Sequence, residues 1–356
     1  MRHRSLFFTV FLAIFPGLLN RAEAARRVTA SALGDAVITI DGHLNEAVWQ
    51  LASRSSGMTE RAPDTGAKAP ISFHVRVLHD ATALYIGLSS ALEEGETLRS
   101  LELRRDSSSI WSDDAITLKF DVNQDKRTTI GLAFNAAGAQ TDFIALNSGR
   151  QFRIEFDAVW ENASAVKDGV WTAEVKVPFT TLGLAEIEEA QGMGFNVTRD
   201  HSLRLATYDW SHLPPELGPV AATHYGVLDG ISGLSSPGRA FRMIPYALAR
   251  SPGEESILGD DLDLKAGIDL RLKISGDLWG EVTLLTDFAE VDLDDALVNL
   301  SRFPLFLPEK RPFFLSGLDV FSFGDARAYQ LFYSRRVGLD SEGNTIPIFG
   351  GAKFFG

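Results

Sequence analysis

The sequence predicts a mainly β protein, in which an antiparallel β-sandwich is followed by longer amphipathic strands. Apolar and polar side chains alternate over residues 116–122 and 130–134, on either side of the polar stretch VNQDKR. A period of two marks strands with one buried face, and the polar stretch marks a hairpin turn. Similar short runs recur along the chain, and the 31 glycines and 24 phenylalanines suit turn-rich β structure with aromatic faces.

The first predicted element is a strand at 37–40, which ends at the turn pair Asp41-Gly42. Asn45 is then expected to cap a short helical turn. Trp49 lies one turn further on and is expected to pack between this helix and the sheet.

Residues 71–77 and 84–88 alternate in the same way and predict a second hairpin. A further strand is expected at 171–177, and Pro178 should end it because proline cannot donate to a ladder. Many short strands separated by turns indicate two stacked antiparallel sheets. Helix should be confined to short connectors such as 184–192.

Residues 1–24 predict a signal peptide. The basic start MRHR precedes the apolar run LFFTVFLAIF, and Ala22-Glu23-Ala24 fits an A-x-A cleavage site. The apolar run is too short to span a bilayer. We therefore expect cleavage after Ala24 and an exported protein of the periplasm or outer membrane.

The composition excludes several classes of protein. The chain has no cysteine, which rules out disulfides, thiolate nucleophiles and cysteine-bound zinc or iron–sulfur sites. Its formal net charge of -13 disfavours nucleic-acid binding, which requires basic patches. No later segment holds eighteen consecutive apolar residues, so no transmembrane helix is expected.

Several motifs in the N-terminal part occur in an order that resembles family 9 carbohydrate-binding modules. IDGHLNEAVW comes first, and the alternating strand after an acidic pair, FNAAGAQTD and GVWTAEVKVPFTTLGL follow. The resemblance covers about residues 37–228 and implies a sandwich domain over 25–228. It also implies carbohydrate binding, with a sugar held by aromatic side chains, and structural calcium.

The composition changes after the sandwich. Residues 229–260 are rich in Gly, Ser, Pro and Asp, as a linker should be, and they include one strand-like run. From 261 onward the alternation extends over strands of ten or more residues, which is typical of an outer-membrane β-barrel. A long soluble hairpin is the alternative.

The segment 287–338, with its PEKRPFF motif, resembles bacterial outer-membrane proteins of unknown function that join a sugar-binding-like sandwich to a C-terminal barrel. Residues 261–356 would then be an incomplete barrel-like region. Three or four strands cannot close a membrane barrel. We therefore expect either a fragment of a longer protein or a different fold for this region.

The candidate carbohydrate-binding residues flank predicted strand ends or loops. Sugar binding requires flat aromatic faces beside polar side chains, and the alternative for each tryptophan is a packing role. The candidates are Trp111, Trp160, Trp210, Tyr208 and Asp209.

The acidic pair Asp113-Asp114 is the candidate donor set for calcium, the one metal that the resemblance implies. No catalytic residue is predicted, because the chain has no G-x-S-x-G, H-E-x-x-H, P-loop or G-x-G-x-x-G pattern. With 47 acidic residues, carboxylate pairs of the kind used by glycosidases carry no information.

The sequence thus favours non-catalytic binding of a saccharide or polysaccharide by an exported, outer-membrane-associated protein, in polysaccharide breakdown or uptake. The C-terminal region would contact the outer membrane. One alternative is an outer-membrane transport or assembly barrel with a periplasmic sandwich that binds no sugar. Another is an accessory part of a glycoside hydrolase, which acts on O-glycosyl bonds.

Overall fold

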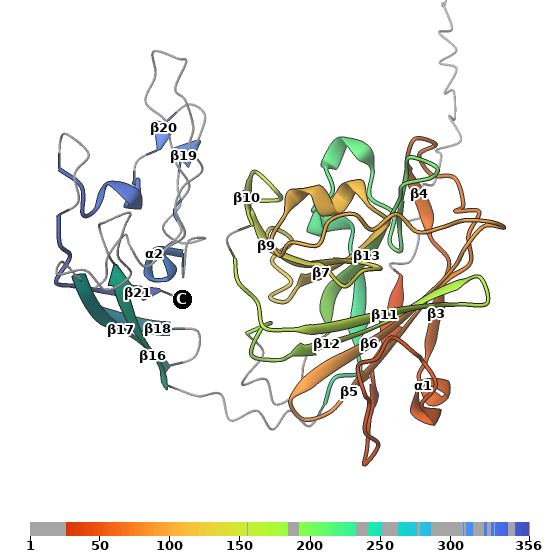
Figure 1. Ribbon diagram of the computed structural model, residues 1–356, viewed down its shortest axis with the longest axis horizontal. Coiled ribbons are helices and arrows are strands. Elements are labelled where there is room, and N and C mark those ends of the chain that lie inside the picture. The colour runs from red at the N-terminus through yellow and green to blue at the C-terminus, as the bar shows by residue number, and fades with distance from the viewer. Residues whose placement is uncertain are drawn as a thin grey trace, which may run out of the picture.

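The computed structural model describes residues 26–154, 156–183, 192–232, 241–250, 263–275, 278–285, 309, 311–315, 324–325, 329–330, 332–340 and 346–355. The predicted signal peptide lies outside these residues. So do the predicted connector helix, except for its last residue, and the whole of the segment 287–308. The described part is mainly β, as expected (Figure 1). None of its helices is long and apolar enough to cross a membrane.

One layer of the N-terminal domain is a nine-stranded sheet built around the predicted hairpin. Strands β7 and β8 pair antiparallel with Leu118 opposite Leu132, which confirms that hairpin and its register. The strand order is β1-β15-β13-β7-β8-β9-β10, and β14 and β4 extend the sheet beside β13. These strands are β1 (Arg27–Thr29), β4 (Thr59–Ala62), β7 (Ala115–Asp121), β8 (Thr129–Asn135), β9 (Gln140–Leu146), β10 (Gln151–Arg153), β13 (Met193–His201), β14 (Ala206–Asp209) and β15 (Gly226–Asp229).

The second layer is a six-stranded sheet in the order β11-β12-β6-β5-β2, with β3 beside β5. The hairpin β5–β6 confirms the second predicted pair of strands, and β12 ends at Pro178 as expected. Two pairings are parallel, β1 with β15 and β2 with β5. In both, an N-terminal strand lies at the edge of its sheet. The strands are β2 (Ser31–Ala32), β3 (Arg54–Ser56), β5 (Phe73–His79), β6 (Ala83–Ala91), β11 (Glu161–Lys167) and β12 (Val170–Pro178).

The core lies between these two sheets, where the alternate apolar side chains of both layers meet. Phe120, Phe134 and Trp171 are fully or almost fully buried in it. The short helix α1 (Ala47–Leu51) packs its buried Trp49 against the six-stranded sheet, as predicted. Its N-cap is Glu46 rather than Asn45, and no side chain caps it.

The described C-terminal residues form a four-stranded antiparallel sheet, β16-β17-β18-β21, and the small pair β19–β20. The strands β16 and β17 have 10 and 13 residues, which confirms the expected long strands. Within the described ranges this sheet is open, since β16 and β21 each pair on one side only. The membrane barrel thus stays a prediction. The elements are β16 (Phe241–Arg250), β17 (Asp263–Ser275), β18 (Leu278–Leu284), α2 (Pro312–Leu315), β19 (Gly324–Asp325), β20 (Tyr329–Gln330) and β21 (Gly350–Phe355).

Candidate functional site

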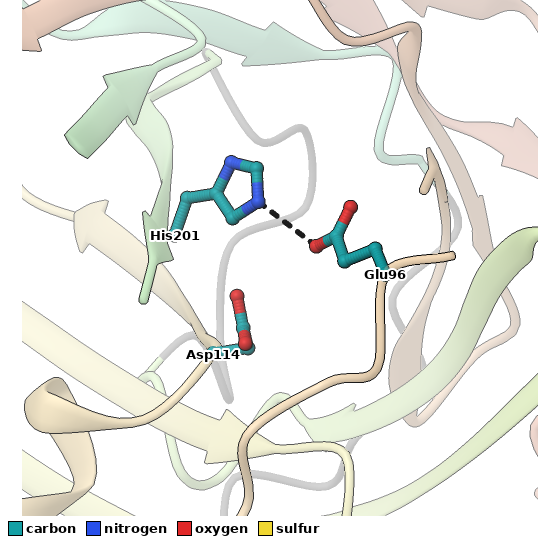
Figure 2. Close-up of side chains that lie close together, drawn as sticks. All are labelled: Glu96, Asp114 and His201. Atoms are coloured by element: carbon teal, nitrogen blue, oxygen red, sulfur yellow. Dashed lines mark ion pairs between the residues drawn. The ribbon is translucent and has the colours of Figure 1, made fainter. Parts of the chain in front are cut away.

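Three titratable side chains converge at one end of the sandwich. Glu96 follows β6, Asp114 immediately precedes β7, and His201 ends β13. Figure 2 shows the three side chains approaching one another from these separate segments. The Nε2 atom of His201 lies 2.9 Å from Oε1 of Glu96. Together they place one imidazole and two carboxylates at a largely buried point.

A fourth residue, Arg199, decides the electrostatics of this cluster. In the antiparallel register, Arg199 lies opposite the buried Ile116, so its side chain belongs to the inner face of β13. Its Nη2 atom lies 3.4 Å from Oε1 of Glu96 and 3.8 Å from Oδ1 of Asp114. The guanidinium carbon also lies 5.7 Å from the ring centre of Trp171. Arg199 therefore supplies a buried positive charge that faces both carboxylates.

Burial lowers the pKa of His201, and the Arg199 guanidinium lowers it further, while the Glu96 and Asp114 carboxylates act in the opposite direction. The imidazole is therefore mainly neutral at pH 7. The cluster is then two carboxylates paired with one guanidinium and one neutral imidazole. Such a group needs the cation, because buried carboxylates without a partner are strongly disfavoured.

The donor atoms of Glu96, Asp114 and His201 lie within 4.8 Å of one another, and their residue types suit a divalent cation. However, Asp114 already accepts hydrogen bonds from the Arg99 amide at 2.8 Å and from the Ser202 hydroxyl at 2.7 Å. The Arg199 guanidinium also occupies the place beside both carboxylates where a metal would be attracted. The geometry therefore favours an ion-pair cluster closed by Arg199 over a metal centre.

Asp113, the other predicted calcium donor, also has protein partners. Its Oδ2 atom accepts hydrogen bonds from the amides of Leu101 and Glu102, each at 2.9 Å, and from Nδ2 of Asn135 at 3.0 Å. The acidic pair therefore holds the loop before β7 in place. Calcium binding by Asp113 and Asp114 stays a prediction.

Trp111 is the one predicted stacking residue that is only partly buried. It lies on the short 3-10 helix η1 (Ser108–Ser112), and its ring contacts Phe143 and Phe152 edge-on, at 5.9 Å between ring centres in both cases. Its Nε1 atom donates to Oγ1 of Thr117 at 3.2 Å, which fixes the ring orientation. Phe152 is 41% exposed, so the pair presents an aromatic corner to solvent.

Gly131 makes this aromatic corner possible. A Cβ atom at this position would lie 2.0 Å from Cζ of Phe143, so only glycine leaves room for that ring on the outer face of β8. The Phe143 ring then packs against both the Trp111 ring and the Phe152 ring. We name Trp111, Phe143 and Phe152 the aromatic corner.

The stacking roles predicted for Trp160 and Trp210 are not compatible with the structure. Both rings are buried in the main core, 5% and 0% exposed. Trp160 donates to Asp142 at 3.1 Å, and Trp210 donates to Oγ of Ser55 at 3.0 Å. A saccharide cannot stack on a ring whose faces are covered by other side chains.

Tyr208 and Asp209, predicted to accompany Trp210, are fully buried as well, which corrects their assignment to a sugar site. The Tyr208 ring lies 6.0 Å from that of His201. Asp209 lies on the other face of β14, where Oδ1 accepts the Thr198 hydroxyl at 2.5 Å and Oδ2 lies 3.6 Å from Nε of Arg61. Both residues thus serve the interior of the domain.

A shallow, open depression of about 420 Å³ adjoins the cluster, with Glu96 in its wall. Its other lining residues are mainly small or apolar: Leu92, Thr97, Leu98, Ser100, Ala136, Ala137 and Val166. It contains no aromatic side chain. The aromatic corner is therefore the better surface for a sugar ring.

Sequence reasoning missed Phe152, Arg199 and His201. Phe152 belongs to a strand of only three residues, too short to show alternation. Arg199 and His201 could have been found from the sequence, because they continue the series of inward-facing residues on β13 that starts at Phe195 and Val197. A charged residue at an inward-facing position indicates a buried polar cluster.

Comparison with known proteins gives two family matches. Residues 40–213 match the family described as "Carbohydrate family 9 binding domain-like", and residues 237–346 match a "Domain of unknown function (DUF5916)". The two matched segments follow one another along the chain and do not overlap. No curated protein matches the chain.

Solved structures with a similar arrangement include a family 9 carbohydrate-binding module from Caldicellulosiruptor kristjanssonii. Its glucose complex is 15% identical, with a TM-score of 0.42, over 57% of this chain and 95% of the module. Its cellotriose complex is also 15% identical, with a TM-score of 0.42, over 59% and 97%. A protein from Bacteroides uniformis, described as a candidate carbohydrate-binding protein, is 13% identical, with a TM-score of 0.44, over 58% and 99%.

Proposed function

We propose that the N-terminal sandwich binds a saccharide non-covalently, and that the aromatic corner is its contact surface. The family match over residues 40–213 supports the ligand class. The observation that carries the site is the partly buried Trp111 ring, fixed by Thr117 and flanked by the exposed Phe152. An oriented aromatic face can pack against the apolar face of a pyranose at little entropic cost.

The Trp111 and Phe152 rings of the aromatic corner are inclined by 69°. They therefore form an L-shaped corner and do not enclose a sugar between parallel faces. This geometry favours a chain end or a single ring that packs on one face and touches the edge of the second.

The test is a glycan array followed by calorimetric titration of the full chain with glucose, cellotriose and the array hits. We expect a saccharide to bind with a dissociation constant in the micromolar to millimolar range. The absence of any bound glycan at millimolar concentration would reject the proposed function. Hydrolysis of a bound oligosaccharide would instead favour the glycoside-hydrolase alternative.

We also propose that the protein is exported and associates with the outer membrane. The leader at 1–24 supports export. The long strands β16 and β17 support membrane association, because strands of about ten alternating residues are typical of proteins that contact lipid with a sheet. Fractionation of cells that express the full chain tests this, and recovery in the soluble cytoplasm would contradict it.

A further inference from the structure

The two faces of the C-terminal sheet differ sharply in chemistry. Residues opposite each other in an antiparallel ladder share a face. Leu270 lies opposite Met243 on one side and Val282 on the other, and Val282 lies opposite Ala352. The same face carries Phe241, Pro245, Ala247, Ala266, Ile268, Leu272, Leu284 and Phe354, together with Gly280 and Gly350. We call it the apolar face.

The opposite face carries a cluster of charged side chains that the chain itself covers. Arg271, Glu281 and Lys353 lie side by side on it, with Glu281 bonded to Arg271 at 3.3 Å and to Lys353 at 3.1 Å. Phe313 of α2 packs over it, because a Cβ at Gly351 would lie 3.2 Å from its ring. Glu281 is only 6% exposed. The polar side chains therefore point toward covering protein.

The apolar face, by contrast, is open to the surroundings. Phe241 is 47% exposed, Met243 51%, Leu272 46% and Phe354 65%. A sheet of a water-soluble domain has the opposite arrangement, with its apolar face covered and its charges in water. A contiguous exposed apolar surface of this kind marks an interaction site.

We propose that the apolar face contacts the acyl chains of a lipid bilayer. The apolar positions of β17 run from Ala266 to Ile274, nine residues that span roughly 26 Å at about 3.3 Å per residue. This length matches that of a strand that crosses the hydrocarbon core. A sheet that borders lipid also has its apolar side chains on the outer face and its polar side chains on the inner face. In a bilayer the open edges of β16 and β21 would need partner strands, because hydrocarbon tolerates no open strand edge.

This inference rests on the proposed membrane association and names its surface, but it is independent of sugar binding. The chain has no cysteine, so a single introduced cysteine carries a unique fluorescent label. Val282 on the apolar face and Ile244 on the opposite face are matched, at 39% and 40% exposed. The full-length variants Val282→Cys and Ile244→Cys are labelled with bimane and mixed with phosphatidylethanolamine–phosphatidylglycerol vesicles.

We expect nitroxide-bearing lipids to quench the label at position 282 by more than half, and the label at position 244 hardly at all. Quenching of position 282 by aqueous iodide would overturn the proposal, because the face would then lie in water. Protection from both quenchers would overturn it too, because protein would then cover the face.

A second measurement covers the case in which the labels disturb the fold. Leu272→Asp should reduce cosedimentation with the same vesicles by at least tenfold, whereas Leu205→Asp, at an 87% exposed position of the sandwich, should not. Equal cosedimentation of both variants would contradict the inference. Glycan binding by Leu272→Asp should equal that of the wild type, so a failure of sugar binding is recognised separately.

Discussion

The indole Nε1 of Trp49 donates a hydrogen bond of 2.9 Å to Oε1 of Glu174, which lies 125 residues further along the chain. The other oxygen of Glu174 accepts the amides of Asp41 and Gly42, each at 3.0 Å. One buried carboxylate on β12 thereby fixes both the turn and the helix that the first sequence motif encodes. This contact explains why the two motifs, IDGHLNEAVW and GVWTAEVKV, occur together.

Replacement of Glu174 by alanine should destabilise the sandwich by about 3 kcal/mol, because three donors, two of them buried, lose their acceptor. For a domain of this size this lowers the melting temperature by roughly 6–12 °C. Thermal unfolding followed by tryptophan fluorescence measures the effect. The control is Glu161→Ala on the neighbouring strand, whose exposed pair with Lys176 should contribute less than about 1 kcal/mol. Equal melting of both variants would contradict the role of Glu174.

Replacement of Arg199 by methionine should destabilise the protein by about 3–5 kcal/mol, because Glu96 and Asp114 are left without a cation in a buried place. The same variant should gain affinity for Zn²⁺, since one imidazole and two carboxylates then lack a competing guanidinium. We expect Zn²⁺ to raise the melting temperature of Arg199→Met and not that of the wild type.

The double variant Arg199→Met/His201→Ala is the control for this prediction, since it removes one zinc ligand and should lose the response. A zinc-dependent rise of the wild-type melting temperature that EDTA reverses would show that Arg199 does not replace a metal. The metal-centre interpretation of the cluster would then be preferred.

The fold could be predicted because its strands obey a two-residue period that only a half-buried sheet explains. The hairpin around Leu118 and Leu132 is an example, where register and burial both follow from the pattern. The site could be predicted only in part, because the sequence pattern around a tryptophan at a strand end is the same whether the ring packs inward or outward. Trp210 packs in the core beside Phe195, whereas Trp111 packs beside Phe143 on the outer face of the sheet, and only the folded structure shows this difference.

The role of Asp113 and Asp114 could not be predicted from the sequence, for the same reason. An acidic pair before a strand suits calcium ligands or amide acceptors equally well. The choice depends on where the loop at 99–102 and the turn at Ser202 lie, and only the folded structure brings these backbone amides to the two carboxylates.

Replacement of Asp200 by asparagine should stabilise the protein at neutral pH. Burial raises the pKa of Asp200 from 3.8 to about 6. The hydrogen bond from the Thr207 hydroxyl and the charges of Arg61 and Lys119 act in the opposite direction and lower this pKa. A carboxyl group with a raised folded-state pKa favours folding below pH 3.8, and this contribution is lost as the pH rises to about 6. Above pH 6 the charged form opposes folding, and the neutral amide does not.

The expected gain of Asp200→Asn is about 1–3 kcal/mol at pH 7, and it should vanish below about pH 4. Urea unfolding of variant and wild type at several pH values measures it, with the exposed Asp64→Asn as the control. A gain that is the same at pH 4 and pH 7 would show that removal of the charge is not its cause.

Replacement of Trp111 by alanine should weaken saccharide binding at least tenfold, because the stacking face of the aromatic corner is lost. Phe152→Ala should weaken it less, since the inclined ring offers only an edge or a second, shorter contact. Calorimetric titration with the best glycan measures both. The matched control is Leu103→Ala, an apolar residue of the same domain that is 73% exposed and not aromatic. If Trp111→Ala binds as tightly as this control, the sugar site lies elsewhere on the sandwich, and the depression beside Glu96 becomes the next surface to mutate.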